Sequence, residues 1–174
     1  MNVLFLGDSL IEYFDWQARF PGHRIGNFGI AGESVQGLLS RVMNIKESFS
    51  DAGMVIVMSG INNIAMGDDD FIRFYRFVIE RLQSSYPEAV ITACSLLPVN
   101  MDFICNDTII RVNRALYELV KETGIEWLNI FERFIDTRGR VITEYLLEDG
   151  VHVSNEGYAI WSKAVDEIIN KFHI

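Results

Sequence analysis

A serine, an aspartate and a histidine in this chain have the types and the spacing needed for nucleophilic acyl transfer. Ser9 directly follows a short apolar run, and Asp149 and His152 lie close together near the other end of the chain. A carboxylate three residues before a histidine can accept a hydrogen bond from one imidazole nitrogen. The other nitrogen is then free to take a proton from a serine hydroxyl. On this hypothesis Ser9 is the nucleophile, His152 the base and Asp149 the residue that orients the base.

Acyl transfer also needs hydrogen-bond donors where negative charge develops on the substrate carbonyl oxygen. Gly32, in the segment Gly-Ile-Ala-Gly, can offer an unobstructed backbone N–H, and Asn62 can offer its side-chain amide. Both residues follow predicted strands. Together with Ser9 they are candidates for an oxyanion hole.

Each of these residues also has an ordinary structural explanation. Ser9 could be only the N-cap of a helix, and Asp149 with the following glycine could form a turn that leaves His152 on the surface. Gly32 and Asn62 could serve loop geometry alone. The two other histidines are weaker candidates for the base, because His23 follows a Pro-Gly turn and His173 is the penultimate residue.

Short apolar runs alternate with longer amphipathic segments along the chain. Apolar runs predict strands, and spacings of three and four between apolar residues predict helices. This alternation is typical of a doubly wound α/β fold, in which a parallel sheet of five strands carries helices on both faces. We expect one domain over residues 1–174. The predicted strands are 3–6, 24–28, 54–58, 89–96 and 126–130, and the predicted helices are 34–46, 68–85, 106–123 and 155–172.

The carboxyl ends of parallel strands share one edge of a sheet, and ligands of doubly wound folds bind there. The predicted topology therefore places Ser9, Gly32 and Asn62 at one edge, each just after its strand. His152 lies in the segment before the last helix, which we expect to reach the same edge.

Composition excludes several classes of function. Hydrophobic residues make up 49% of the chain and charged residues 22%, and the net charge is −9. No basic block is present, so binding to nucleic acid or to an anionic membrane surface is not expected. The first basic residue is Arg19, and no apolar run approaches membrane-spanning length, so we expect a cytoplasmic protein without a signal peptide or stable membrane insertion. The two cysteines, Cys94 and Cys105, are too few for a structural zinc site.

Four short blocks resemble those of a known family. Residues 7–10 read Gly-Asp-Ser-Leu, the block that names the GDSL esterases, also called SGNH hydrolases. The letters of the second name stand for a serine, a glycine, an asparagine and a histidine, which fall in order on Ser9, Gly32, Asn62 and His152. Asp149 matches the aspartate three positions before the family's histidine. The segments Gly-Ile-Asn-Asn at 60–63 and Leu-Leu-Pro at 96–98 look similar to the branch that contains platelet-activating-factor acetylhydrolase-like proteins.

The resemblance implies a flavodoxin-like sheet and a serine ester hydrolase without metal or cofactor. Ser9, His152 and Asp149 would form the catalytic triad, and Ser9 N–H, Gly32 N–H and the Asn62 amide would form the oxyanion hole. The branch favours short acyl groups, often acetyl. Asn63 stands where the family commonly has aspartate, and Val-Ser at 153–154 replaces the usual Pro-Asn after the histidine. These departures bear on subfamily and substrate, because no catalytic group is missing.

The expected function is therefore hydrolysis of short-chain esters of a carbohydrate, a lipid or a small metabolite, with acetyl as the expected acyl group. Long-chain lysophospholipase or thioesterase activity is an alternative, and so is a catalytically silent binding module on the same fold. The expected partner is a small-molecule ester, and the sequence leaves the oligomeric state open. Phe14, Trp16 and Phe20, soon after the nucleophile, could line an acyl or leaving-group pocket or simply cover the sheet.

Overall fold

The computed structural model describes residues 1–172 and contains the predicted five-stranded parallel sheet. The strand order is β2-β1-β3-β4-β5, which is the order of flavodoxin-like sheets, so the predicted α/β fold class is confirmed. β1 and β3 are central strands with continuous apolar sequences, and all residues of β3 are buried. The strands are β1 (Asn2–Gly7), β2 (Arg24–Gly29), β3 (Met54–Met58), β4 (Val90–Cys94) and β5 (Glu126–Leu128).

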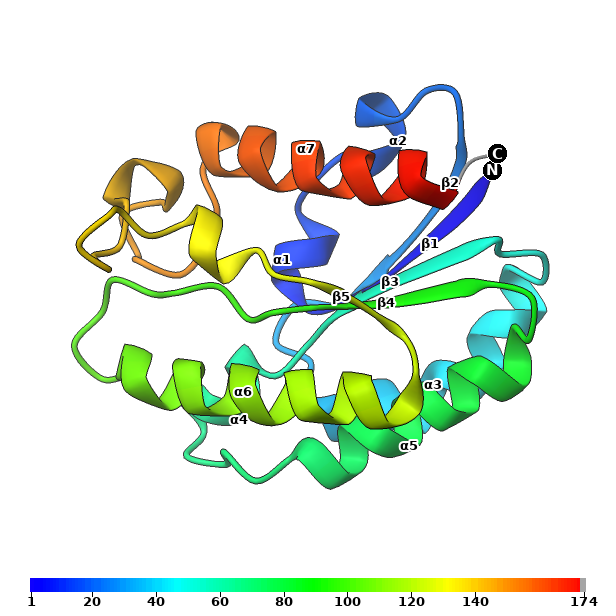
Figure 1. Ribbon diagram of the computed structural model, residues 1–174, viewed down its shortest axis with the longest axis horizontal. Helices are drawn as coiled ribbons and strands as arrows, with labels where there is room; N and C mark the ends of the chain where they lie inside the picture. Colours follow the sequence, from blue (N-terminus) through cyan, green and yellow to red (C-terminus); the bar gives the residue numbers. More distant parts are fainter. Residues whose placement is uncertain (173–174) are drawn as a thin grey trace.

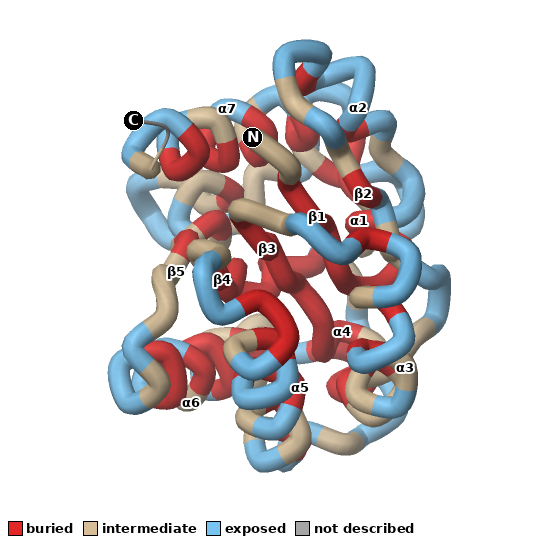
Figure 2. The backbone as a smooth tube through the Cα atoms, turned by 90° about the vertical axis from the view of Figure 1, so that its right-hand side faces the viewer, coloured by how far each residue is buried: buried red, intermediate tan, exposed pale blue. Residues whose placement is uncertain are grey.

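Helices cover both faces of this sheet. Figure 1 shows α7 on one face together with α1 and α2, and α3, α5 and α6 on the other. In Figure 2 the buried backbone runs through the strands and the inner sides of these helices. The helices are α1 (Ser9–Glu12), α2 (Trp16–Arg19), α3 (Val35–Ser48), α4 (Ile61–Ala65), α5 (Ile72–Ser85), α6 (Asn106–Thr123) and α7 (Asn155–Phe172), with 3-10 turns η1 (Phe131–Arg133) and η2 (Thr143–Tyr145).

The predicted boundaries were wrong at three places where side chains bind the backbone. The helix predicted from Asp68 begins only at Ile72, because the Asp68 carboxylate accepts hydrogen bonds from the Gln36 and Asn63 side chains and from the Asp70 N–H instead of capping a helix. Strand β4 ends at Cys94 rather than residue 96, since the Asn113 side chain binds both N–H and C=O of residue 96. Strand β5 ends at Leu128 rather than residue 130, because the Ser95 hydroxyl accepts the N–H groups of residues 130 and 131.

The aromatic residues that follow the nucleophile pack beneath α7. Trp16 is fully buried and stacks on Phe5 with ring centroids 4.3 Å apart. Phe14 stacks on Tyr158 of α7, also at 4.3 Å. Phe20 lies parallel to Trp16 at 6.3 Å and is buried. Of the two roles considered for these residues, the structure therefore favours cover for the sheet over the lining of a pocket.

Within residues 1–172, none of the helices is both long and apolar enough to cross a membrane. In the same range no three His, Cys, Asp or Glu side chains are grouped so that they could hold a metal ion. His173 lies outside the described residues.

Candidate active site

A chain of hydrogen bonds links Ser9, His152 and Asp149 across the two ends of the sequence. The Ser9 Oγ lies 3.1 Å from Nε2 of His152, and Nδ1 of His152 lies 2.6 Å from Oδ2 of Asp149. Ser9 is buried, whereas the His152 and Asp149 side chains are partly exposed. With Nδ1–H donating to the carboxylate, Nε2 is left as a proton acceptor beside the serine hydroxyl.

The start of α1 fixes the position of Ser9. Asp8 is the N-cap of this helix, and its Oδ1 accepts a 3.0 Å hydrogen bond from the Leu10 N–H. Ser9 is therefore the first helical residue and not the cap, so the capping explanation of this serine was wrong. Its backbone N–H has no acceptor within residues 1–172, as expected for a first-turn N–H.

A tight turn positions His152. The Asp149 Oδ1 accepts the backbone N–H groups of Val151 and His152, both at 2.9 Å. Gly150 has a φ of 72°, and a Cβ there would lie 2.0 Å from the carbonyl oxygen of Asn100. Only glycine fits this close approach. The Asn100 N–H donates to the Gly150 carbonyl at 2.8 Å, so the loop after β4 holds the turn in place.

The pKa values of two carboxyl groups at the site, Asp149 and Asp8, are shifted in opposite directions. Partial burial opposes ionisation of Asp149, but hydrogen bonds from the His152 ring and from the Val151 and His152 N–H groups outweigh it and lower its pKa. Asp8 is fully buried, and its Oδ2 has no partner among the described residues. The pKa of Asp8 is raised to about 7, chiefly by burial and to a smaller extent by nearby Glu33, against the opposing effects of the Leu10 N–H and of His152.

The candidate oxyanion donors lie on two adjoining segments. Gly32 has a φ of 76°, in the left-handed region that favours glycine, and its N–H has no acceptor in the described part of the chain. The Asn62 Nδ2 donates to the Glu33 carbonyl at 3.0 Å, which leaves its second hydrogen available. Asn62 and His152 line the same pocket, so the structure brings residues from all four blocks to one edge of the sheet.

That pocket, which we call the ester pocket, has a volume of about 230 Å³ beside His152. The polar residues Asn62, Asp149 and His152 lie on its lining, and the rest of the lining is apolar. Its apolar residues come from α4, from the loop after β4 and from the turn before α7: Ile61, Ala65, Met101, Phe103, Ile104 and Val151.

Sequence reasoning missed these lining residues and also Tyr13, whose ring centroid lies 5.4 Å from that of His152. The rule that ligands bind at the carboxyl ends of strands points to the loop after β4, but it does not say which of its side chains face the histidine.

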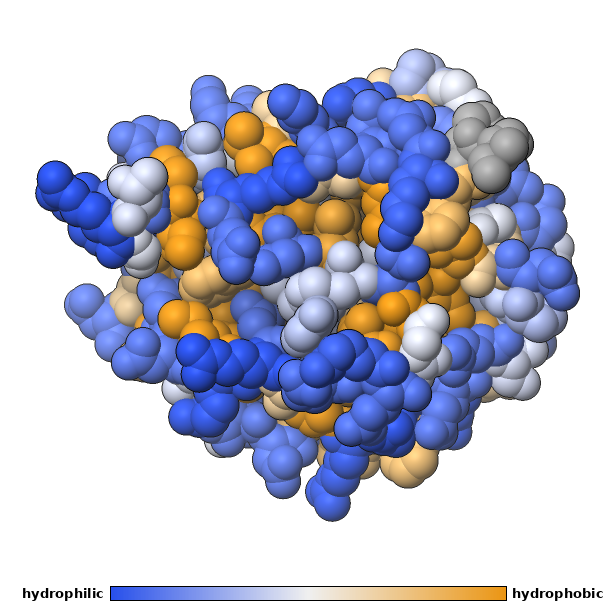
Figure 3. All heavy atoms as spheres, viewed as in Figure 1, coloured by the Kyte–Doolittle hydropathy of each residue, from blue (hydrophilic) through white to orange (hydrophobic). Residues whose placement is uncertain are grey.

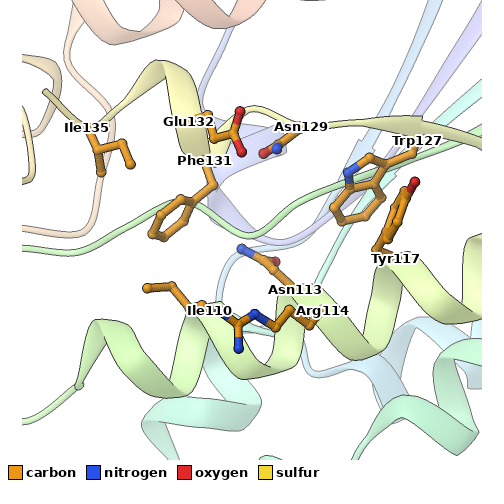
Figure 4. A pocket seen from close by; sticks show the side chains of 9 residues that line it. All are labelled: Ile110, Asn113, Arg114, Tyr117, Trp127, Asn129, Phe131, Glu132 and Ile135. Carbon is orange, nitrogen blue, oxygen red and sulfur yellow. The ribbon is translucent and has the colours of Figure 1, made fainter. Parts of the chain in front are cut away.

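A larger pocket of about 550 Å³, which we call the β5 groove, lies between α6 and the segment that follows β5. Figure 4 shows Trp127 and Tyr117 at one end and Ile110, Phe131 and Ile135 toward the other, with polar side chains between them. In Figure 3, which has the view of Figure 1, apolar side chains show in recesses between polar ones. The groove shares no lining residue with the ester pocket.

The chain is similar to a known family and to known proteins over most of its length. The model of the GDSL-like lipase/acylhydrolase family matches residues 5–160. The chain is 25% identical over 174 residues to the platelet-activating factor acetylhydrolase IB subunit alpha2 of Rattus norvegicus, covering 97% of this chain and 76% of that protein.

Solved structures show the same fold. A protein of Streptococcus pneumonia described as a platelet activating factor is 27% identical, with a TM-score of 0.82 over 96% of this chain and 83% of that one. Axe2, an acetylxylan esterase of Geobacillus stearothermophilus, is 19% identical, with a TM-score of 0.75 over 94% of this chain and 91% of that one. At that identity the second likeness concerns the fold alone.

Proposed function

The chain belongs to the GDSL-like lipase/acylhydrolase family and is an esterase, and on that basis we propose that Ser9 hydrolyses short-chain esters through an acyl-enzyme. The observation that carries this proposal is the 3.1 Å contact between Ser9 Oγ and His152 Nε2, with Asp149 behind the imidazole. A nucleophile, a base and an orienting carboxylate in this arrangement are the parts that acyl transfer needs.

In the first half-reaction, the Ser9 Oγ attacks the ester carbonyl carbon while its proton moves to Nε2 of His152. The carbonyl oxygen becomes an oxyanion, which accepts hydrogen bonds from Ser9 N–H, Gly32 N–H and the Asn62 amide. The C–O bond to the alcohol then breaks, and the alcohol leaves with the proton held by His152. The product at this stage is an ester between Ser9 and the acyl group.

In the second half-reaction, water takes the place of the alcohol. His152 accepts a proton from the water as its oxygen attacks the acyl carbon, and the same donors stabilise the second oxyanion. The bond to Ser9 Oγ breaks, and the proton on His152 returns to the serine. Asp149 stays ionised throughout and stabilises the imidazolium that forms in each half-reaction, in line with its lowered pKa.

The size of the ester pocket supports a short acyl group. Its 230 Å³ is below the roughly 300–1,000 Å³ of pockets that hold drug-sized ligands. Its apolar lining suits a hydrocarbon group, and the presence of Asn62 and His152 on the lining supports binding of that group next to the proposed reaction centre. The similarity to a platelet-activating factor acetylhydrolase subunit supports acetyl as the acyl group.

A second candidate, hydrolysis of long-chain esters, is favoured by the apolar residues around the site. Phe103 is 74% exposed on the rim of the ester pocket, and Tyr13, which contacts His152, is 61% exposed. Leu147 is also exposed, and its N–H donates to the His152 carbonyl. A long chain that leaves the pocket could lie over these side chains.

An ester panel separates the two candidates. We would measure kcat/KM of the purified protein on p-nitrophenyl esters from acetyl to palmitoyl, with Ser9→Ala as the blank. The proposal expects Ser9-dependent hydrolysis that is fastest for acetyl or butyryl. A maximum at long chains would favour the second candidate, and hydrolysis that is equal in Ser9→Ala would contradict the role of Ser9.

A further inference from the structure

Asn63, the residue after the Asn62 donor, is the centre of a hydrogen-bond network that joins three segments. It is 1% exposed, and its Oδ1 accepts the Val35 N–H at 2.9 Å. Its Nδ2 donates to Oε1 of Gln36 at 2.7 Å and to Oδ2 of Asp68 at 2.9 Å. All side-chain hydrogen-bonding groups of this amide therefore have partners in the structure.

The network closes on itself. The Gln36 Nε2 donates to the same Asp68 oxygen at 3.0 Å, and the Asp68 N–H donates to the Asn63 carbonyl at 2.9 Å. Hydrogen bonds from Gln36 and Asn63 lower the pKa of Asp68, and Arg73 acts in the same direction. Asp68 is thus an anion that accepts from two side-chain amides.

These contacts join the two segments that carry the candidate oxyanion donors. Val35 and Gln36 begin α3, just after the turn with Gly32, and Asn63 lies in α4 beside Asn62. The hydrogen bond from Asn62 to the Glu33 carbonyl crosses the same boundary. The position of the Asn62 amide relative to the Gly32 N–H therefore depends on how α4 is held against the start of α3.

We propose that Asn63 and Asp68 are positioning residues, an inference that rests on the proposed function. They fix the position of the Asn62 amide relative to the Gly32 N–H, so that both can donate to the oxyanion. At position 63 the family commonly has an aspartate, whereas here an amide stands there and the carboxylate is supplied by Asp68. In the pair of Asn63 and Asp68, the amide donates the hydrogen bond and the carboxylate accepts it. The positioning role therefore requires that one residue of the pair, and only one, is an ionised carboxylate.

Asn63→Asp breaks this rule by placing a second carboxylate against Asp68. Two carboxylates at hydrogen-bond distance cannot both stay ionised without strong repulsion, so either the network opens or one of them takes a proton. Misplacing one oxyanion donor costs up to about 10²- to 10³-fold in rate, and we expect a loss of kcat of about tenfold or more at pH 8. KM should change much less, because the network does not line the ester pocket.

The double variant Asn63→Asp with Asp68→Asn, which we call the swap, restores the network with its polarity reversed. The carboxylate introduced at position 63 can still accept from Val35 N–H, and it can accept from the new amide at position 68. If the Gln36 side-chain amide flips, its nitrogen can donate to the carboxylate at position 63 and its oxygen can accept from the amide at position 68. The oxygen of that amide can still accept the Asp70 N–H, which in the wild type donates to Asp68 Oδ1 at 3.3 Å. We therefore expect kcat of the swap within about threefold of the wild type.

The experiment measures kcat and KM on p-nitrophenyl acetate from pH 5.5 to 8.5 for the wild type, Asn63→Asp, Asp68→Asn and the swap. Ser9→Ala supplies the blank, and urea unfolding reports stability. The ratio of the Asn63→Asp rate to the wild-type rate should rise as pH falls, because protonation gives the acid pair a donor again. Arg73, whose charge lowers the pKa of Asp68, and the neighbouring Asp69 and Asp70 are unchanged in all four proteins.

A purely structural role would lower stability without this pH-dependent ratio and without rescue of kcat. The proposal is overturned if folded Asn63→Asp keeps wild-type kcat at pH 8, or if its rate ratio does not depend on pH. It is equally overturned if the swap does not fold or keeps the kcat of the single variant. If the single variant Asn63→Asp does not fold, the kcat of the swap tests the proposal alone. A value within about threefold of the wild type supports the proposal, and a larger loss overturns it.

A readout without turnover separates this proposal from the proposed function. The side-chain amide resonances of Asn62 in an NMR spectrum should shift in Asn63→Asp and return in the swap. If the wild type shows no Ser9-dependent hydrolysis, the proposed function fails and these resonances still test the network. Resonances that stay in place in Asn63→Asp would contradict the network's role in positioning Asn62.

Discussion

The ester pocket and the β5 groove differ in size and in chemistry. Size alone would select the groove as the reaction site, whereas the reactive side chains select the ester pocket. The groove is the larger, at about 550 Å³ against 230 Å³, and it is lined by Trp127, Arg114 and Glu132 among others. Within the described residues, however, only the ester pocket adjoins a serine that contacts a histidine held by a carboxylate. The arrangement of a nucleophile, a base and an orienting carboxylate, and not the volume of the pocket, therefore identifies the reaction site.

Removing the nucleophile beside the ester pocket should have the greatest consequence. We expect Ser9→Ala to lower kcat/KM by about 10⁴- to 10⁶-fold, because the oxyanion donors and binding alone supply only the residual rate. Steady-state assays on p-nitrophenyl acetate measure this loss. Ser40→Ala, on the exposed side of α3, is the matched control and should keep full activity. Equal losses in both variants would contradict the assignment.

Two asparagines, one from each region, provide the next test. Asn62→Ala removes a proposed oxyanion donor and should lower kcat by about 10²- to 10³-fold with little change in KM. Asn129→Ala removes a side chain of the same type from the β5 groove, where it makes no side-chain hydrogen bond to another described residue, and should change kcat less than about twofold. A large loss in Asn129→Ala would move the reaction toward the groove.

A buried ionisable group also distinguishes the two regions. Asp8, which precedes the nucleophile, is buried and has a pKa of about 7, whereas the charged residues Arg114 and Glu132 of the groove are exposed. Because the native pKa lies above the unfolded value of 3.8, the native state binds the proton more tightly and this group lowers stability as pH rises through that window. The wild type should lose about 2 kcal/mol from this source between pH 5 and pH 6.5.

Asp8→Asn removes that titration and keeps an oxygen to cap α1. Urea unfolding of both proteins across pH 5 to pH 8 measures the difference in unfolding free energy, which should grow in favour of the variant as pH rises. Stability curves that run parallel at all pH values would show that Asp8 is ionised in the native state at pH 5, contrary to the effect of its burial.

The smallest effect is expected on the selectivity for the length of the acyl chain. Phe103→Ala opens the rim of the ester pocket and should raise the octanoyl-to-acetyl ratio of kcat/KM by about threefold to tenfold. Trp127→Ala makes a comparable truncation in the β5 groove and should leave this ratio unchanged. Competition assays with mixed esters give the ratio directly, and a larger shift in Trp127→Ala would mean that the acyl chain lies in the groove.

The long regular elements could be predicted from the sequence because their apolar periodicity is strong. Helices α6 and α7 begin and end at the predicted residues, and so does β3. The short helices α2 and α4 were not predicted, since four or five residues are too few to show a period. The segment between β5 and α7 has no regular pattern, and its two 3-10 turns were also missed.

The reacting residues were easier to predict than the pocket around them. Ser9, Asp149 and His152 have side chains whose chemistry is rare in combination, and parallel topology brings strand ends together. The walls of the ester pocket depend instead on the fold of the loop after β4. Two hydrogen bonds between Asn106 and Val99, and one from Asn100 to the Gly150 carbonyl, fix that loop, and no spacing in the sequence signals them.

Covalent labelling tests the role of Ser9 as the nucleophile without relying on a choice of substrate. The protein would be treated with diisopropyl fluorophosphate, digested and mapped by mass spectrometry while residual esterase activity is followed in parallel. We expect one adduct per chain, on Ser9, with activity lost in proportion to labelling and no adduct in Ser9→Ala. Activity that survives complete labelling of Ser9, or inactivation with the adduct on another residue, would contradict that role.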